Sequence, residues 1–365
     1  MKEKIIKNKK IILEYIILIC LLSFAIAFVN NNYSFYDETI IKVTDIKITD
    51  SSVSTNSLGL EETYSTQNIT GLIMNNQKKG QTIEIENEIS TSSVVNETYK
   101  IGDEIFVDGK NITGLKRDKY VVFMIAMFIF SIFLVGQMKG LLSVVTVIVN
   151  MAIFYLGLNL YSSGTSLVLL CLGESFLFTI FSLFLTNGKH RKTLAAIISV
   201  FVSTLTLFIL TLIIIKTTKY SGINFTGMEF LTIPAEEAFM AELVLGGLGA
   251  IMDVCVTISA SFAELIEKDR NISTKSLVGS GKKIGNDIMG TMINVIFFTY
   301  LCSGLPVFVL ALRNGFTLQN YISSNFTLEI TRFLVGAIGI VLAIPISIYI
   351  STKIFKKEKI KWIKY

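Results

Sequence analysis

Eight apolar runs, each close to or above the length that crosses a lipid bilayer, dominate this sequence. A membrane-spanning helix needs about 17–25 mostly apolar residues. Hydrophobic residues make up 52% of the chain and charged residues only 17%, which is too little charge for an ordinary soluble protein. We therefore predict an all-α transmembrane helix bundle with about eight spans, at 11–29, 120–135, 140–160, 165–185, 193–215, 238–263, 288–312 and 328–350.

The basic residues predict how these spans are oriented. Lysine and arginine gather at 2–10, 189–192, 268–283 and 353–364. With eight spans and a cytoplasmic start, all four clusters fall on one side of the membrane. Because cytoplasmic loops are enriched in basic residues, we expect both termini to be cytoplasmic. The net charge of +5 then reflects topology, and nucleic acid is not expected as a partner.

One long polar segment, 30–119, interrupts the apolar runs. Its stretches 39–49, 82–89 and 104–108 alternate polar and apolar residues, which predicts half-buried strands. We expect a small exported β domain of four to six strands between the first two spans. The predicted organisation is an anchor at 1–29, this domain at 30–119, a seven-span membrane domain at 120–350 and a basic cytoplasmic tail at 351–365.

The first span admits two interpretations. Its basic start and the small residues Ala25 and Ala27 are typical of a cleaved signal peptide. Its apolar run, however, is longer than the roughly 7–15 residues usual for such a peptide. An uncleaved anchor is therefore favoured over a signal peptide.

The sixth span carries acids inside its apolar run. At about 100° per residue, one stripe of this helix holds small and acidic side chains. A carboxylate near the bilayer centre costs about 2.5–3.5 kcal/mol on insertion scales, so such residues are functional-site candidates. The stripe consists of Glu242, Gly246, Gly249, Asp253, Ala260 and Glu264.

The seventh span has a matching polar face. Asp287, Gly290, Thr291 and Asn294 recur at three- and four-residue spacing, and Thr291 and Asn294 could reach the depth of Asp253. In the functional interpretation, Asp253 binds or relays a proton or cation, with Asn294, Thr291 and Ser259 as supporting groups. In the structural interpretation, these residues form an interhelical polar clasp. Function is favoured for Asp253 and structure for the other three.

Three further acids add to these candidates. Glu174 lies in the middle of the fourth span, with no lysine or arginine at comparable depth, so a simple internal salt bridge is not expected. Asp287 lies near the interface and could instead act as an N-terminal acid of its helix. Glu242 borders the external end of the sixth span, where attraction of cations and simple solvation are equally good interpretations.

No catalytic, cofactor-binding or metal-binding residue is predicted. The four cysteines lie inside apolar runs without metal spacing, and His190 is the only histidine. The segment 278–283 lacks the first glycine and the hydroxyl of a phosphate-binding loop. Asp253 and Asp287 suggest an intramembrane aspartyl protease, but the Gly-x-Gly-Asp motif of that class is absent. We do not expect an enzyme.

The blocks 246–253 and 285–294, with Leu305-Pro306, resemble the YibE/F-like family of bacterial multi-pass membrane proteins. The layout of anchor, polar domain and helix bundle is similar over nearly the full length. The resemblance implies a bacterial plasma-membrane protein and gives Asp253, Glu264, Asp287 and Asn294 importance as motif positions. It implies no established activity, although such proteins are sometimes supposed to be permease-like.

These observations lead to two functional hypotheses. The favoured one is a transporter or permease component, in the lipid bilayer, that moves an unknown small solute or ion past a polar core in the sixth and seventh spans. The rival is a non-transporting membrane scaffold that presents the exported β domain to an envelope protein partner.

Overall fold

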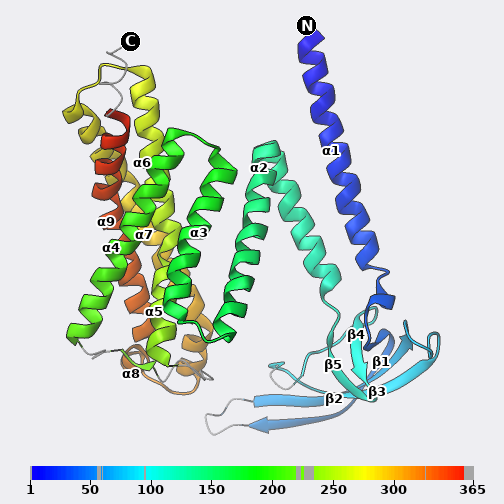
Figure 1. The fold of residues 1–365 in the computed structure, drawn as a ribbon. Coiled ribbons are helices and arrows are strands. Elements are labelled where there is room, and N and C mark those ends of the chain that lie inside the picture. The colour runs from blue at the N-terminus through cyan, green and yellow to red at the C-terminus, as the bar shows by residue number, and fades with distance from the viewer. Residues whose placement is uncertain are drawn as a thin grey trace. The chain divides into compact units, whose positions relative to one another are not determined.

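The computed structural model describes residues 2–55, 59, 61–93, 96–218, 223–225, 234–324 and 326–356. The chain divides into two compact units, Met1–Gly140 and Leu141–Tyr365 (Figure 1). Seven helices in the described residues are long and apolar enough to cross a membrane. The predicted helical, membrane-type architecture is therefore confirmed, whereas the number and direction of the spans remain predictions.

The first unit joins a long helix to an antiparallel sheet. Helix α1 (Lys2–Val29) is followed by a 3-10 turn (Tyr33–Phe35) and five strands in the order β3-β2-β1-β4-β5. The predicted small sheet domain near the N-terminus is thus confirmed. Its strands are β1 (Thr39–Thr55), β2 (Glu61–Ile73), β3 (Thr82–Ser90), β4 (Glu104–Asp108) and β5 (Asn111–Leu115).

Alternation of side chains builds the core of this sheet. Successive residues of a strand point to opposite faces, so apolar residues at every second position all reach the same side of the sheet. Ile41 of β1, Ile69 of β2, Ile85 of β3 and Ile105 of β4 are each at most 2% exposed and pack together. Strand β1 continues beyond the predicted 39–49 as far as Thr55, paired with β2.

Helix α2 (Asp118–Ser162) contains a break. Gln137 has φ 50° and ψ −136°, which is not helical, and a Cβ at Gly140 would lie 2.6 Å from the carbonyl oxygen of Ile132. The regular helix is therefore interrupted here. The two predicted spans, 120–135 and 140–160, correspond to the first arm (118–136) and the second arm (138–162) of this one helix.

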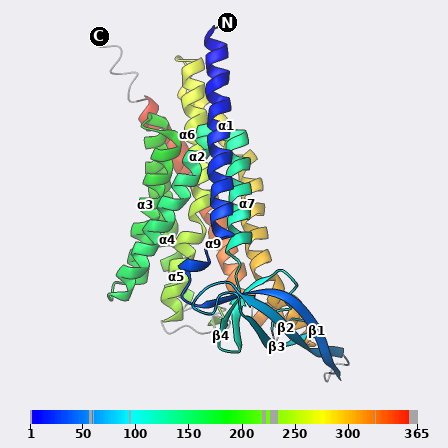
Figure 2. The same ribbon diagram turned by 90° about the vertical axis from the view of Figure 1, so that its right-hand side faces the viewer.

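In the part of the chain that the structure describes, the second unit is a bundle formed by the second arm of α2 and seven helices (Figures 1 and 2). The predicted sixth span is two helices, α5 and α6, joined at Gly247. Residues 351–356 of the predicted tail continue α9, and 357–365 lie outside the described residues. The seven helices are α3 (Leu167–Asn187), α4 (Arg191–Thr218), α5 (Ala235–Gly246), α6 (Leu248–Lys268), α7 (Thr274–Arg313), α8 (Leu318–Ser324) and α9 (Thr327–Lys356).

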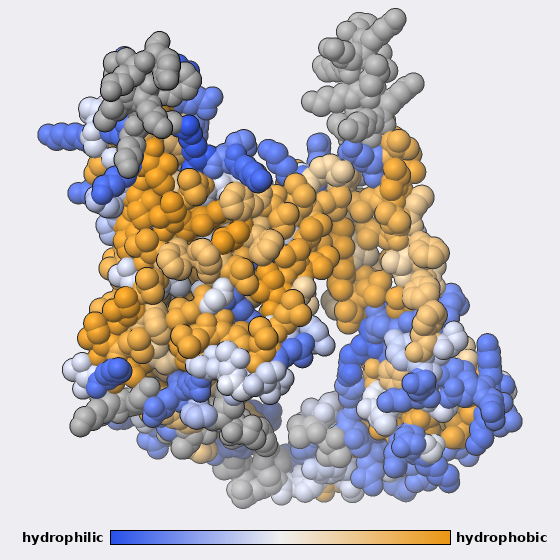
Figure 3. All heavy atoms as spheres, viewed as in Figure 1, coloured by the Kyte–Doolittle hydropathy of each residue, from blue (hydrophilic) through white to orange (hydrophobic). Residues whose placement is uncertain are grey.

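The core of the bundle lies among α4, α6, α7 and α9. Ile251 and Phe262 of α6, Leu277 of α7 and Ile340 of α9 are fully buried there. Small residues allow close approach: a Cβ at Gly281 would lie 2.7 Å from the Phe262 ring. On the face seen in Figure 3 the helices are largely apolar and the sheet is largely polar, as expected for helices surrounded by lipid.

Candidate functional site

The acidic stripe of α6 faces away from the bundle core. Asp253 is exposed, as are Gly249, Thr257 and Glu264 on the same side of the helix. The opposite side of α6, which includes Ile251, Ile258 and Phe262, makes the contacts with α4, α7 and α9. The structure therefore places the predicted stripe on one face, but on the outer face of its own unit.

The polar face of α7 is exposed too. Asp287, Gly290, Thr291 and Asn294 all lie on its outer side, and the Thr291 hydroxyl donates to the carbonyl of Ile288 at 2.8 Å. Within the described residues, no hydrogen bond joins Asp253 to Thr291 or Asn294. The expected support of Asp253 by these two residues is absent because α6 and α7 pack through their apolar faces.

Ser259 lies on the buried side of α6, away from Asp253. Its hydroxyl is fully buried and shares a hydrogen bond of 3.1 Å with Ser351 of α9. Ser347, one turn earlier on α9, is also fully buried. Ser259 thus has a structural partner, but on α9 and not on α7, where the predicted polar clasp would have placed it.

Two other glutamates form specific pairs. Glu264 pairs with Lys268 at 2.9 Å on the exposed face of α6, which is a solvated arrangement. Glu237 accepts hydrogen bonds from the backbone N–H of Leu167 at 2.9 Å and from Ser166, and so caps the start of α3. A helix N-terminus leaves backbone N–H groups unpaired, and a carboxylate satisfies them.

Glu242 is not a free entrance acid, because it pairs with an arginine that the sequence analysis missed. Arg332 of α9 forms an ion pair with Glu242 of α5 and a second with Glu329 at 3.2 Å. The guanidinium also lies 5.8 Å from the centre of the Phe239 ring. A Cβ at Gly246 would overlap the Tyr300 hydroxyl, so the side chain of Tyr300 reaches from α7 to α5 beside this network.

Glu174 of α3 is the buried acid without a partner. Its side chain is 5% exposed, and neither carboxylate oxygen has a hydrogen-bond partner among the described residues. Gly157, on the second arm of α2, covers it so closely that a Cβ there would overlap the carboxylate. An unpaired ionised carboxylate in such a place has a large desolvation cost.

The contact of α2 with α3 continues as a polar seam, which we define as Asn150, Gly157, Glu174 and Ser182. The Asn150 amide donates to the Ser182 hydroxyl at 2.9 Å, while its carbonyl oxygen is buried without a partner. The seam thus contains more acceptor oxygens than donors.

The first unit contains a buried ion cluster at the base of the sheet. Lys116 is fully buried, and its ammonium lies 3.0 Å from Asp118 and 3.4 Å from Glu104. It also donates to the carbonyl of Val29, the last residue of α1, at 3.0 Å. This lysine therefore connects the sheet to the end of α1 and the start of α2.

Two tyrosines complete the cluster. Tyr33 donates to Glu104 at 2.7 Å and Tyr36 donates to Asp118 at 2.8 Å, while their rings lie 5.3 and 5.7 Å from the Lys116 ammonium. Burial, and then the hydrogen bond to Glu104, raises the pKa of Tyr33 above its usual range. Burial and the bond to Asp118 raise the pKa of Tyr36 in the same way.

These shifts predict that the sheet domain loses stability in alkali. The raised pKa values mean that folding favours the neutral phenols. This stabilisation is complete below the unfolded pKa of about 10 and is lost as pH rises towards the higher folded values. Denaturant unfolding of the full-length protein, followed at the sheet amides by hydrogen exchange, should show stability falling above about pH 10. Tyr33→Phe should make this fall shallower, and an equally steep fall would contradict the assignment.

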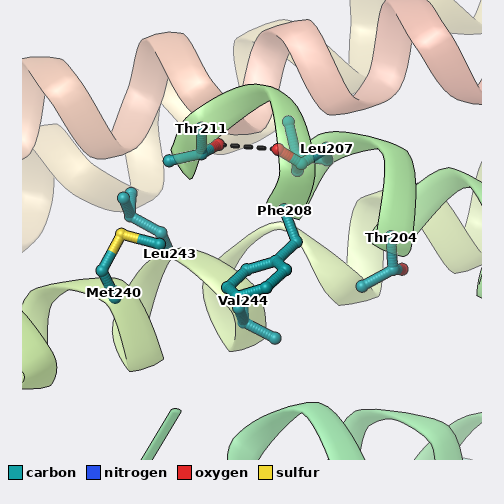
Figure 4. A pocket seen from close by; sticks show the side chains of 7 residues that line it. All are labelled: Thr204, Leu207, Phe208, Thr211, Met240, Leu243 and Val244. Carbon is teal, nitrogen blue, oxygen red and sulfur yellow. Dashed lines mark hydrogen bonds between the residues drawn. The ribbon is translucent and has the colours of Figure 1, made fainter. Parts of the chain in front are cut away.

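A small pocket between α4 and α5 is lined by apolar groups (Figure 4). The Thr211 hydroxyl there donates to the carbonyl of Leu207 at 2.8 Å, so this polar group is already paired. Among the described residues, no group of three or more histidine, cysteine or acidic side chains is arranged to hold a metal ion. The hydroxyl of Thr204, which also lines the pocket, is buried without a hydrogen-bond partner in the described part of the chain.

Comparison with known protein families identifies both parts of the chain. Residues 124–357 match the YibE/F-like protein family, and residues 34–118 match the YibE/F family N-terminal domain. No curated protein and no solved structure matches the chain. The two matched regions cover most of the sequence, and the expected resemblance is confirmed: the chain belongs to the YibE/F-like family.

Proposed function

We propose that this protein is a membrane transporter or permease component in which a buried acid carries a coupling proton or cation. The observation that supports the proposal most directly is Glu174, a carboxylate enclosed within a helix bundle and left without a hydrogen-bond partner. Ionisable groups inside membrane helices are costly, and in transport proteins they mark ion and proton pathways. Glu174 takes the leading role in this proposal, and Asp253, which is exposed on α6, becomes the second candidate.

We further propose that the protein lies in a bacterial plasma membrane with both termini in the cytoplasm and the sheet outside. The support is the gathering of basic residues at the loops and ends assigned to one side. Lys110, which is exposed in the turn between β4 and β5, should then react with a membrane-impermeant amine reagent in intact cells. Lack of reaction, in cells where broken-cell controls react, would contradict this orientation.

The test compares solute and element contents of cells that lack the protein with cells that express the wild type, Glu174→Gln or Asp253→Asn at equal abundance. Glu174→Gln keeps the shape of the side chain but removes its ability to carry a charge. We expect its cells to differ from the wild type in the same solutes as the deletion strain. Asp253→Asn tests the second candidate, and we expect its cells to stay closer to the wild type than the Glu174→Gln cells do. Wild-type contents in the Glu174→Gln cells would refute the role of Glu174.

The scaffold hypothesis is supported by the buried Lys116 cluster, which ties the sheet firmly to α1 and α2. A firm joint suits a domain that is presented to a partner. This hypothesis expects no solute difference shared by the deletion strain and the Glu174→Gln cells, so the same comparison separates the two.

A further inference from the structure

We propose that Glu174 is a proton-binding site, covered by the turn of α2 that contains Gly157, so that the ion held there is the proton and not a metal cation. This inference rests on the proposed transport function and narrows it to one coupling ion. In the resting protein, Glu174 should then hold its proton at neutral pH. This protonation can be tested without measuring transport.

The surroundings of Glu174 provide no charge that could compensate an ionised carboxylate. In the described residues, no ion pair reaches it. On α5, Glu237 caps α3 and Glu242 pairs with Arg332. The remaining titratable or charged side chains on the helices packed against it are Cys171 one turn earlier on α3, Tyr155, Tyr161 and Lys139 on α2, Arg191, Lys192 and Lys216 near the ends of α4, and Glu236 at the start of α5.

A buried acid without counter-charge or hydrogen-bond donors is more stable in its neutral form. Ionisation would place a full charge in an apolar environment, whereas protonation removes that charge. The neighbouring hydroxyls do not change this balance, because Ser175 donates to the carbonyl of Leu172 at 2.7 Å and Thr179 to that of Ser175. Their hydrogens are already used, so they do not stabilise a carboxylate.

A metal cation would require ligands that are missing around Glu174. Hard cations bind several oxygen atoms at once, with six or more for ions such as calcium. On the α2 side, a Cβ at Gly157 would meet only the Glu174 carboxyl group and the apolar side chain of Leu170 as its nearest atoms. The unpartnered oxygen of Asn150 lies on α2 about two helical turns, or roughly 10 Å, away from Gly157. A proton, in contrast, needs only the carboxylate itself.

Gly157 is what allows α2 to cover the acid. Any side chain at this position would overlap the carboxylate, so the arm or Glu174 would have to move. Gly173, next to Glu174 on α3, makes a matched control, because a Cβ there has no atom within 4 Å. Alanine substitutions at the two glycines thus separate loss of the shielding of Glu174 by α2 from the general effect of replacing a glycine in a helix.

Infrared spectroscopy of the full-length protein in lipid vesicles tests the proton site directly. A protonated carboxyl has a C=O band above the amide region, and a carboxylate lacks it. At neutral pH we expect a band in the wild type that is lost in Glu174→Gln and retained in Asp253→Asn. Identical wild-type and Glu174→Gln spectra would overturn the proposal. Loss of the band on adding sodium or another metal cation at constant pH would also overturn it, in favour of a metal site.

The same infrared C=O band tests whether the turn of α2 at Gly157 shields Glu174 from water. Gly157→Ala should admit water to Glu174 and weaken or abolish the band at neutral pH, whereas Gly173→Ala should leave it unchanged. An unchanged band in Gly157→Ala would refute the shielding role of Gly157.

The infrared and solute measurements together also separate the proton-site proposal from the transport proposal. A band without any solute phenotype refutes transport and leaves the proton site standing, whereas a solute phenotype without a band refutes the proton site alone.

Discussion

Replacing Lys116 with methionine is expected to lower the free energy of unfolding of the sheet domain by about 3–5 kcal/mol, the usual effect of removing one partner from a buried ion pair. The ammonium is fully buried, and the side chain of Glu104 is 7% exposed. Methionine has a similar length but no charge, so Glu104 and Asp118 would remain close together without their cation. The bond to the end of α1 would be lost as well.

Hydrogen exchange of the sheet amides in the full-length protein measures this loss. Lys110→Met is the matched control, because Lys110 is exposed and surface substitutions usually change stability by about 0.5 kcal/mol or less. A second variant, Lys116→Met with Glu104→Gln, should recover part of the stability, because it removes one of the two uncompensated charges. Equal effects of Lys116→Met and Lys110→Met would show that the cluster contributes nothing to folding.

The architecture was predictable because it depends on local patterns. A helix of membrane length follows from an uninterrupted apolar run, and a strand such as β3 follows from alternation over a few residues. Both properties are visible in one stretch of sequence. The break at Gln137 was anticipated as a gap between two runs, but its non-helical backbone was not, since Gln137 has no obvious turn signal.

The orientation of α6 was not predictable from its own sequence. Periodicity shows that Asp253 and Gly249 share one face and that Ile251, Ile258 and Phe262 share another. It does not show which face meets the neighbouring helices. The apolar face makes those contacts in the structure, because the packing of large side chains outweighs that of small ones. The stripe of small and acidic residues alone favours the opposite arrangement, with the acidic face at the helix contacts.

Partners distant in sequence were beyond the sequence analysis. Glu174 was recognised as a costly acid, but its cover by Gly157 depends on how α2 packs on α3. Lys116 looked like an ordinary lysine at the end of a polar segment, and only the pairing of β4 with β1 and β5 brings Glu104 beside it. For Arg332 a signal existed: Glu329 and Arg332 lie three residues apart at the start of an apolar run.

Arg332→Gln is the second substitution with a large expected effect. Arg332 is 15% exposed and Glu329 is 18% exposed, so their ion pair is mostly shielded from water, whereas Glu242 is 46% exposed. Loss of hydrogen bonds to a charged group typically costs about 1.5–3 kcal/mol, and we expect destabilisation of the bundle in that range. The loss should appear first as faster hydrogen exchange in α5, which Arg332 connects to α9.

Two variants show whether the geometry of the guanidinium matters. One nitrogen of Arg332 contacts Glu242 and the other contacts Glu329, and a single ammonium cannot reproduce both contacts. Arg332→Lys should therefore fall between the wild type and Arg332→Gln. Arg313→Gln, at the exposed end of α7, is the control for loss of one positive charge and should leave exchange in α5 unchanged. If Arg332→Lys behaves as the wild type, charge alone connects α5 to α9; if Arg313→Gln matches Arg332→Gln, the contact with Glu242 contributes nothing.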